Sequence, residues 1–346
     1  MKRNLFSLVG GLVLLMAAPL AIVSAWGGYG GQKPQTKDEY RLEGPFTQGN
    51  LTVFLIRGQD KIKGQTFITL QEALIQKKVI VRETRTVSEL SIENISSEEV
   101  FVQSGDIVKG GQQDRMLVVD LILPPHSGKV PIAAFCVENG RWSRRGNEEV
   151  TTFNSSSNVV ASREVKLAAK SRGSQGEVWR EVAAAQDKLS ANVGGSVKNE
   201  ASPTSFQLAL ENKDVQRTAE NYVDGLSGIV NGKPDVIGYV FAINGKINSA
   251  DIYASSTLFK KLWPKLLKAS AIEAIAELRR GEKFEAPRPD AVRGFLDDSP
   301  AAKETQKDVS SRVQMTTRDS DGKVFFETRD RAKADAWVHR NVIKKN

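Results

Sequence analysis

The apolar residues of this 346-residue chain change their spacing near Val150, and this change constrains the fold more than any other feature. Before that point, short β-rich runs are separated by Gly, Pro, Asn and Ser, a pattern typical of strands joined by turns. After it, apolar residues recur at the spacing of one helix face. The sequence therefore predicts an α+β protein, in which a β-rich N-terminal half (sandwich-like or a curved antiparallel sheet) packs on a C-terminal half of helices and a hairpin. The predicted strands are Leu51–Arg57, Phe67–Leu70, Val79–Glu83, Val87–Glu93, Val100–Gln103, Met116–Leu123 and Val130–Val137.

Residues that begin or end helices and turns define the elements of the C-terminal half. Ser174 and Glu177 form a capping-box pattern that begins a helix, and Gly194 ends it. Asn244-Gly245 supplies the two positive-φ residues of a type I′ turn and so predicts a hairpin. Pro264 is expected to kink or restart the next helix, because proline lacks the N–H donor and clashes with the preceding turn. The remaining predictions are a helix over Val215–Leu226, a long surface connection over Glu282–Asp308 and a last hairpin of Arg312–Thr317 and Lys323–Thr328.

The N-terminus has the order of a secretory signal peptide. Lys2 and Arg3 precede an apolar run, and Val23-Ser24-Ala25 is a small-residue cleavage site. We expect cleavage after Ala25 and a periplasmic or secreted protein. The alternative is an uncleaved N-terminal membrane anchor, because the apolar run is just long enough to span a bilayer. The expected organisation is a signal peptide (1–25), a flexible leader (26–40), a β-rich half (41–150) and a helical and hairpin half (151–346), with 41–346 as one compact domain as the alternative.

Composition excludes several function classes. One cysteine excludes a disulfide scaffold and a cysteine-rich zinc module, and two histidines make a multi-histidine site hard to assemble, so we expect no metal and no cofactor. Without the signal peptide, 47 basic and 41 acidic side chains leave a formal charge of +6. The basic residues are spread along the chain, so we expect no nucleic-acid partner, and no membrane contact beyond the export signal. The sequence carries no signal for an oligomeric state.

Residues able to carry chemistry gather in the last two strands of the β-rich half. A six-residue polar loop, Pro124–Lys129, separates these strands, which would form a hairpin if Leu123 paired with Val130. That register pairs Arg115 with Glu138 and places Cys136 on the same face, because side chains alternate along a strand. One face would then carry a guanidinium, a carboxylate and a thiol.

This cluster has two interpretations. In the structural one, Arg115 and Glu138 form an ordinary cross-strand ion pair, and Cys136 is a small buried hydrophobe. In the catalytic one, nearby cations activate Cys136 as a nucleophile, and His126 or His339 serves as its base. Next to the cluster, the run Arg141–Arg145 contains three guanidiniums and the indole of Trp142, which can hold an anion and stack on a planar group.

Several of these segments together resemble one bacterial family, the ADP-ribosylglycohydrolase and rhodanese-phosphatase-associated protein domains. The family pattern runs roughly G-E, G-x-x-Q-N-R and then C-V-E-x-G-R-W, and Asp114 stands where the family usually has Asn. An amide donor is thereby replaced by an acceptor-only carboxylate. The resemblance covers most of the mature chain and implies no reaction, since the family is a domain of unknown function. The matching segments are Gly105-Asp106, Gly110–Arg115, Pro124-Pro125, Val130-Pro131-Ile132, Cys136–Trp142 and parts of Gly238–Leu267.

We therefore expect an exported module that binds an anionic, nucleotide-like small molecule. Arginines would hold the anionic group and the indole would stack on a planar one. Two alternatives stay open: a hydrolase or transferase that uses Cys136 as its nucleophile, and a purely structural secreted protein whose signature holds the fold. An enzyme needs a depressed thiol pKa and a base within hydrogen-bond reach, whereas a binding module needs an accessible site. The candidate ligand-binding residues are Gln113, Arg115, Glu138, Arg141 and Trp142.

Overall fold

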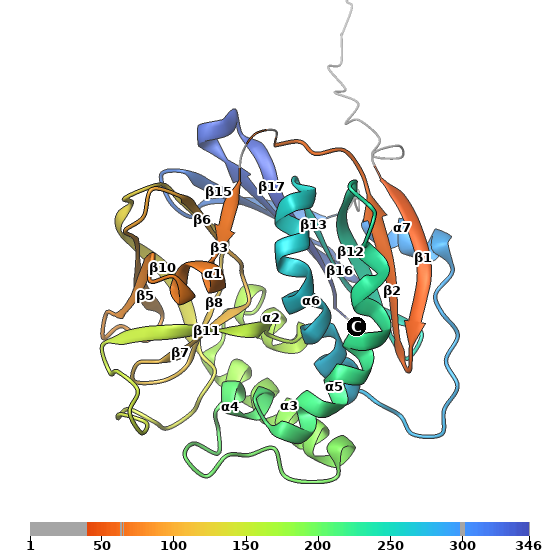
Figure 1. Cartoon of the computed structure of the whole chain (residues 1–346), viewed down its shortest axis with the longest axis horizontal. Helices are drawn as coiled ribbons and strands as arrows, with labels where there is room; N and C mark the ends of the chain where they lie inside the picture. Colours follow the sequence, from red (N-terminus) through yellow and green to blue (C-terminus); the bar gives the residue numbers. More distant parts are fainter. Residues whose placement is uncertain (1–39, 63, 65, 298–301, 346) are drawn as a thin grey trace, which may run out of the picture. The chain divides into compact units, whose positions relative to one another are not determined.

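Strands from both ends of the chain pair in one eight-stranded antiparallel sheet (Figure 1). The computed structural model describes residues 40–62, 64, 66–297 and 302–345. Strand β2 pairs with β12, so the β-rich half hydrogen-bonds directly to the second half of the chain. Across the sheet the order is β1 (Arg41–Gln48), β2 (Leu51–Arg57), β12 (Val236–Ile243), β13 (Lys246–Tyr253), β17 (Ala336–Lys344), β16 (Lys323–Asp330), β15 (Val313–Asp319) and β14 (Lys303–Asp308).

Most other strands of the N-terminal half close into an antiparallel barrel, which is the strongly curved form of the predicted sheet. Val81, Leu117 and Ala134 belong to the apolar cluster inside it, while the neighbouring Phe135 packs on the main core of the chain. The barrel order is β10 (Gly128–Cys136), β5 (Glu89–Asn94), β4 (Val79–Glu83), β11 (Thr152–Val160), β7 (Asp106–Gly110) and β8 (Arg115–Leu117). A further sheet contains β3 (Phe67–Thr69), β6 (Glu99–Val102) and β9 (Leu121–Leu123), with helix α1 (Leu70–Ile75) following β3.

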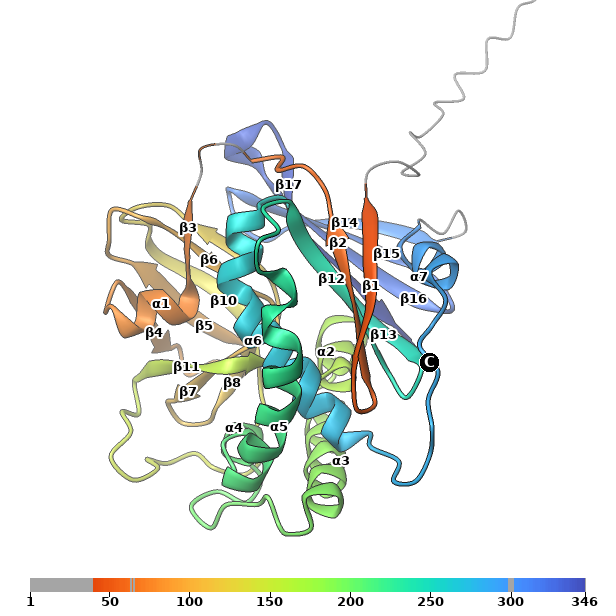
Figure 2. The same ribbon diagram turned by 45° about the vertical axis from the view of Figure 1, so that its right-hand side comes forward.

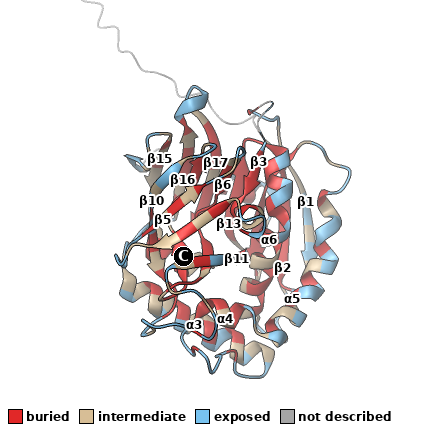
Figure 3. Cartoon of the chain, turned by 60° about the vertical axis from the view of Figure 1, so that its left-hand side comes forward, coloured by how far each residue is buried: buried red, intermediate tan, exposed pale blue. Residues whose placement is uncertain are grey.

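Helix α6 (Ser256–Ala276) connects the barrel to the large sheet. It contacts β11 of the barrel, β12 of the large sheet and helices α3 and α5, as Figures 1 and 2 show. Much of it is buried (Figure 3). None of the described helices is both long and apolar enough to cross a membrane. The other helices are α2 (Arg163–Lys170), α3 (Gln175–Val193), α4 (Phe206–Leu210), α5 (Lys213–Leu226) and α7 (Pro289–Leu296), with 3-10 turns at Ser227–Val230 and Arg331–Lys333.

The structure confirms the predicted fold class and several of the predicted turns and helix ends. The Asn244-Gly245 turn joins β12 to β13, with φ of 52° and 74°, both in the left-handed region that a type I′ turn requires. The Ser174 side chain accepts from the backbone N–H of Glu177 and begins α3, and Gly194 ends it with φ of 80°. These signals are local, so they predict local structure well.

Two elements of the C-terminal half differ from expectation. Helix α6 continues through Pro264 without interruption. Because Pro264 has no N–H, the carbonyl of Lys260 lacks its usual partner within the helix. Both residues lie on the exposed side, where solvent can satisfy that carbonyl. The segment Glu282–Asp308 is also more than a connection, since it contains α7 and β14.

The predicted hairpin register is wrong. The expected strand Met116–Leu123 divides into β8 and β9, and β9 pairs with β6 in the three-stranded sheet instead of continuing beside β10. Within the barrel, Cys136 lies opposite Arg115 and Ala134 opposite Leu117, a shift of two residues from the prediction. A shift by an even number keeps every side chain on its predicted face, but it changes which residues are paired.

Candidate functional site

One end of the barrel interior carries three polar side chains. Glu83, Arg115 and Cys136 each lie two positions along their strands from a residue of the barrel's apolar core (Val81, Leu117 and Ala134). Because strand side chains alternate between faces, these three belong to the interior side of the barrel. The side chains of Arg115 and Cys136 are fully buried, and that of Glu83 is 5% exposed. We call these residues the barrel-end cluster.

Two loops cover this end, and four charged residues with largely buried side chains tie them together. The β7–β8 loop supplies Asp114, and the β10–β11 loop supplies Glu138, Arg141 and Arg145. Asp114 accepts from Arg145 Nη1 and Nη2, both at 2.8 Å, and from Ser205 Oγ at 2.7 Å. Glu138 accepts from Arg141 Nε at 2.6 Å and Nη2 at 2.8 Å, and from the Asp114 backbone N–H at 2.9 Å. We call these four residues the loop network.

The charges of the loop network stabilise one another in a buried setting. Burial alone would raise the pKa of Glu138, but hydrogen bonds, led by those from Arg141, outweigh it and lower this pKa. Burial would likewise lower the pKa of Arg145, and the Asp114 carboxylate reverses that shift. Asp114 also accepts from the Gly110 N–H at 3.1 Å, so both its oxygens receive donors. An Asn amide nitrogen could accept none of these bonds, which explains why a carboxylate suits this chain.

Arg141 is held firmly, although it was expected among the arginines that would hold the ligand's anionic group. Besides Glu138, it donates to the backbone carbonyls of Gly110 at 3.2 Å, Gly111 at 3.1 Å and Ser143 at 2.7 Å. The predicted Arg115–Glu138 ion pair is wrong. Glu138 lies past the end of β10, where the loop arginines reach it, and Arg115 contacts Glu83 instead, with Nη2 3.5 Å from Oε1.

Arg115 is the less satisfied guanidinium. Its Nη1 donates to the backbone oxygen of Gln113 at 3.2 Å and to the side-chain oxygen at 3.4 Å. Its Nε and Nη2, and Oε2 of Glu83, have no hydrogen-bond partner among the described residues. The indole of Trp142 covers it, with the ring centroid 5.7 Å from the guanidinium carbon, and that residue is 50% exposed. Gln113 is fixed in turn by donating to the Glu138 carbonyl at 2.9 Å.

Cys136 has the properties of a structural residue. Burial raises the pKa of its thiol to about 11, although the nearby Arg115 charge opposes this shift. Its backbone N–H and carbonyl both bond the side chain of Gln175, at 2.9 and 2.8 Å. His126 lies in the exposed β9–β10 loop and His339 bonds two aspartates, so neither histidine pairs with the thiol in the described structure. These are not the conditions of an activated nucleophile.

A second buried polar group was missed by sequence reasoning. His339 on β17 contacts Asp120 through Nδ1 at 2.8 Å and Asp251 through Nε2 at 3.0 Å. Its ring stacks on Tyr253, with centroids 4.5 Å apart. Burial would lower the pKa of His339, but the two carboxylates, led by Asp120, raise it to about 9. The one available signal was that polar residues interrupt apolar strands at 251 and 339. Among the described residues, no cluster of His, Cys, Asp and Glu is arranged to hold a metal ion.

Comparison with known protein families gives a match over most of the chain. A family model, described as ARG and Rhodanese-Phosphatase-superfamily-associated Protein domain, matches residues 39–343. That span includes the barrel, both covering loops and the large sheet. No curated protein and no solved structure matches the chain.

Proposed function

The chain belongs to the family of ARG and Rhodanese-Phosphatase-superfamily-associated Protein domains, and on that premise we propose that it is an exported module binding an anionic, nucleotide-like small molecule at the barrel end. The family description names associated proteins and no reaction. If ARG is taken as ADP-ribosylglycohydrolase, the association favours a ligand related to ADP-ribose. The proposal keeps Gln113, Arg115 and Trp142 as ligand-binding residues and assigns Glu138 and Arg141 to holding the loops in place.

The observation that carries the proposal is the incomplete hydrogen bonding of Arg115. A buried guanidinium with two donor nitrogens lacking partners among the described residues costs folding free energy. An anionic oxygen placed there would recover that cost through charge-assisted hydrogen bonds. Barrel mouths are also common positions for ligand sites. Because Trp142 covers Arg115, entry of a ligand requires the indole to move aside.

The surrounding groups define the ligand's chemistry. Glu83 Oε2 is an acceptor beside the donors of Arg115, so a fitting ligand carries a hydroxyl or N–H next to its anionic oxygen. The hydroxyls beside the phosphate of a ribose phosphate have this arrangement. The displaced indole of Trp142 can then stack on a planar group such as a nucleobase. ADP-ribose contains all three features.

The loop network supports a second candidate, a purely structural role for the signature. Its four charged side chains pair with one another and hold two loops over the barrel end, and Arg145 Nε is their one buried nitrogen without a hydrogen-bond partner among the described residues. The two candidates differ at Glu83 and at the three proposed ligand-binding residues, where the structural role predicts no ligand at all.

Thermal unfolding with ADP-ribose, ribose 5-phosphate and inorganic phosphate separates these candidates. We expect ADP-ribose to raise the Tm of the wild type, with saturation, and ribose 5-phosphate to do so at higher concentration. Arg115→Gln should abolish the shift and Trp142→Ala should weaken it. Arg144→Gln is the matched control, because Arg144 lies in the same loop but is exposed, and it should keep the shift. If ADP-ribose leaves the Tm unchanged at millimolar concentration, the structural role is correct.

Export is the second part of the proposal and has its own test. The charged, apolar and small-residue order of residues 2–25 supports cleavage after Ala25. The intact mass of protein recovered outside the cytoplasm should then correspond to a chain that begins at Trp26. Recovery of the uncleaved chain in the membrane fraction would favour the N-terminal anchor instead.

A further inference from the structure

A pocket lies beside the turn between β12 and β13, and the end of α6, the start of α7 and the end of β17 also line it. Water-sized molecules can occupy about 650 Å³ of it, within the range of roughly 300–1,000 Å³ that is usual for ligand sites. None of its described lining residues belongs to the barrel-end cluster or the loop network. We call it the hairpin pocket, and binding there is independent of the function proposed above.

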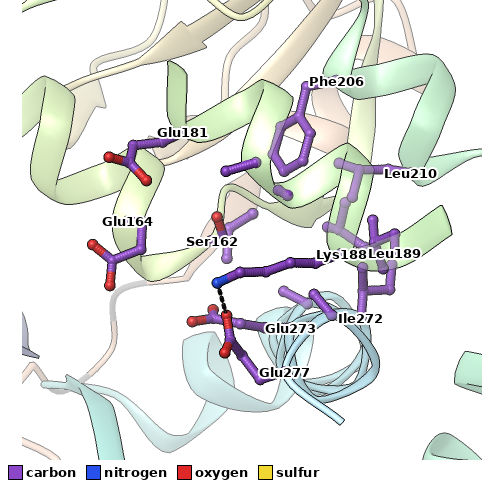
Figure 4. Close-up of a pocket in the computed structure, with 16 residues that line it drawn as sticks. Ser162, Glu164, Glu181, Lys188, Leu189, Phe206, Leu210, Ile272, Glu273 and Glu277 are labelled. Carbon is purple, nitrogen blue, oxygen red and sulfur yellow. Dashed lines mark hydrogen bonds and ion pairs between the residues drawn. The ribbon is translucent and has the colours of Figure 1, made fainter. Parts of the chain in front are cut away.

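The described residues that line the hairpin pocket carry a net positive charge. Glu277 is the single carboxylate among them, and the Lys188 ammonium pairs with it at 2.5 Å (Figure 4). An anion that enters the pocket therefore meets positive charge that Glu277 does not neutralise. The four cations come from separate segments of the chain: Arg163 from α2, Lys246 from β13, Arg279 from the segment after α6 and Lys344 from β17.

Two of these cations are available to a ligand. Arg163 pairs with Glu164 at 2.6 Å, whereas the ammonium groups of Lys246 and Lys344 form no hydrogen bond or ion pair with the residues that the structure describes. Strand β13 is hydrogen-bonded to β17, so the neighbouring ends of these strands bring both lysines to one pocket. A small molecule with two negative groups can therefore contact both.

Asn248 adds a hydrogen-bond acceptor to the wall of the pocket. The residue is 4% exposed, and its Nδ2 donates to Glu273 Oε1 at 2.7 Å. Its Oδ1 is buried and receives no donor from the described residues. A buried acceptor without a donor costs folding free energy, and a hydroxyl of a bound molecule would recover that cost. An anion that also carries a hydroxyl suits both the charge of the pocket and this acceptor.

Contacts around the β12–β13 turn hold the pocket in shape. Asn244 Nδ2 donates to the carbonyl of Glu277 at 2.6 Å, and Asn244 Oδ1 accepts from Asn50 at 2.9 Å. A Cβ atom at Gly245 would lie 2.6 Å from the backbone oxygen of Glu285, so glycine is what lets the segment after α6 pass this closely. Because the turn is fixed against the end of α6, a ligand has little of the site to order when it binds.

We propose that the hairpin pocket binds a small polyanion that carries a hydroxyl group, the chemistry shared by hydroxy-polycarboxylates and sugar bisphosphates. Two of its negative groups pair with Lys246 and Lys344, and its hydroxyl donates to Asn248 Oδ1. A molecule with one negative group leaves one lysine unpaired, and a molecule without a hydroxyl leaves Asn248 unsatisfied, so both bind more weakly. The positive charge of the pocket disfavours cations.

The test is calorimetric titration of the whole protein with three probes at constant ionic strength. Citrate has three carboxylates and a hydroxyl, tricarballylate has the same carboxylates without the hydroxyl, and fructose 1,6-bisphosphate has two phosphates with hydroxyls. We expect saturable binding of citrate or of the bisphosphate, and the tighter of the two identifies a carboxylate or a phosphate ligand. Tricarballylate should bind roughly tenfold more weakly than citrate, the effect of one lost hydrogen bond to a buried acceptor.

Variants of the lining residues locate the bound anion. Lys246→Gln and Lys344→Gln should each weaken binding roughly tenfold, since each removes one charge-assisted contact. Ala291→Trp introduces a large ring at an exposed position of the pocket wall and should abolish binding. Lys260→Gln is the matched control, because it removes the same charge from an exposed position on α6 that does not line the pocket. It should leave binding unchanged, as should Arg115→Gln at the barrel end.

The proposal is overturned if neither citrate nor the bisphosphate binds saturably. It is also overturned if Lys260→Gln weakens binding as much as Lys246→Gln, which would indicate attraction to net charge alone, or if citrate and tricarballylate bind equally well. If a lysine variant does not fold, Ala291→Trp decides, because unchanged binding in that variant places the anion elsewhere. Loss of binding in Arg115→Gln would place the anion at the barrel end, so this measurement and the ADP-ribose response succeed or fail separately.

Discussion

Arg115 and Cys136 lie directly opposite each other on strands β8 and β10, and both are fully buried within the barrel. A guanidinium beside a thiol stabilises the thiolate, yet removal from water destabilises it more, so the pKa of Cys136 is raised to about 11. The pair therefore contains a neutral thiol and a cation, with Glu83 as the contacting carboxylate. The chemistry of the barrel end consequently belongs to Arg115 and Glu83 rather than to the thiol.

Cys136 should react slowly with alkylating reagents in the native protein. It is buried and its thiol stays protonated at neutral pH, so both access and thiolate fraction are low. Replacement by alanine should cost only about 1–2 kcal/mol of unfolding free energy, since the cavity left is small. Labelling with iodoacetamide at pH 7 and urea unfolding measure the two quantities. Rapid labelling would instead indicate an activated thiol and favour the enzyme.

Arg141→Ala should destabilise the protein strongly. It removes the bidentate partner of the buried Glu138 carboxylate and the donors to three backbone carbonyls, so we expect a loss of about 3–5 kcal/mol. Arg144→Ala in the same loop should cost less than about 1 kcal/mol, because that side chain is exposed. Urea unfolding of both variants is the measurement. Equal stability of the two would mean that the loop network does not hold the loops.

Asp114→Asn, which introduces the residue usual in the family, should also destabilise this chain. The amide nitrogen would face donors from Arg145, Ser205 or Gly110, and the charge opposite Arg145 would be lost. We expect a cost of about 2 kcal/mol, as for a buried donor left unsatisfied. Comparing Asp114→Asn in the wild type and in an Arg145→Gln background tests this, since the double variant should lose less than the sum. Simple additivity would contradict the assigned pairing.

His339 should make stability depend on pH above neutrality. Its folded pKa of about 9 exceeds the ordinary 6.5, so its stabilisation is complete below pH 6.5 and is lost as the pH rises through 9. Between pH 6.5 and 8 the unfolding free energy should fall by about 2 kcal/mol. This prediction is limited to pH values below 8, because burial lowers the pKa of Lys170 to about 8. As the pH rises above 8, loss of the Lys170 proton in the folded state raises the unfolding free energy.

Substitution of the two histidines identifies the source of that slope. His339→Asn should remove it, whereas His126→Asn should leave it unchanged, because His126 is exposed in a loop. Asn also tolerates the positive φ of 49° at position 126, so the control keeps its backbone. Urea unfolding at pH 6.5, 7.2 and 8 provides the data. A slope that survives in His339→Asn would assign it to another group.

The sequence by itself determined the fold class and the local elements. Strand alternation, the Ser174 cap and the Asn244-Gly245 turn act through neighbouring residues, so they predict structure without knowledge of the rest of the chain. The signature from Cys136 to Trp142 likewise indicated the family, and the match of the chain to the family model confirms it. The predicted register was wrong by two residues, an even number, so each side chain stayed on its predicted face of the strand. Arg115 and Cys136 were therefore correctly placed on one face.

Only the tertiary structure decided which charges pair. Strand β9 leaves the barrel to pair with β6, and this long-range choice, invisible in local patterns, shifts β8 against β10. Glu138 then falls beyond the strand, within reach of Arg141 and Arg145, while Arg115 is left with Glu83. The same holds for His339, whose aspartates come from positions 120 and 251. A buried charge takes the partner that folding brings within hydrogen-bond distance, and that distance is set by strand pairing across the whole chain.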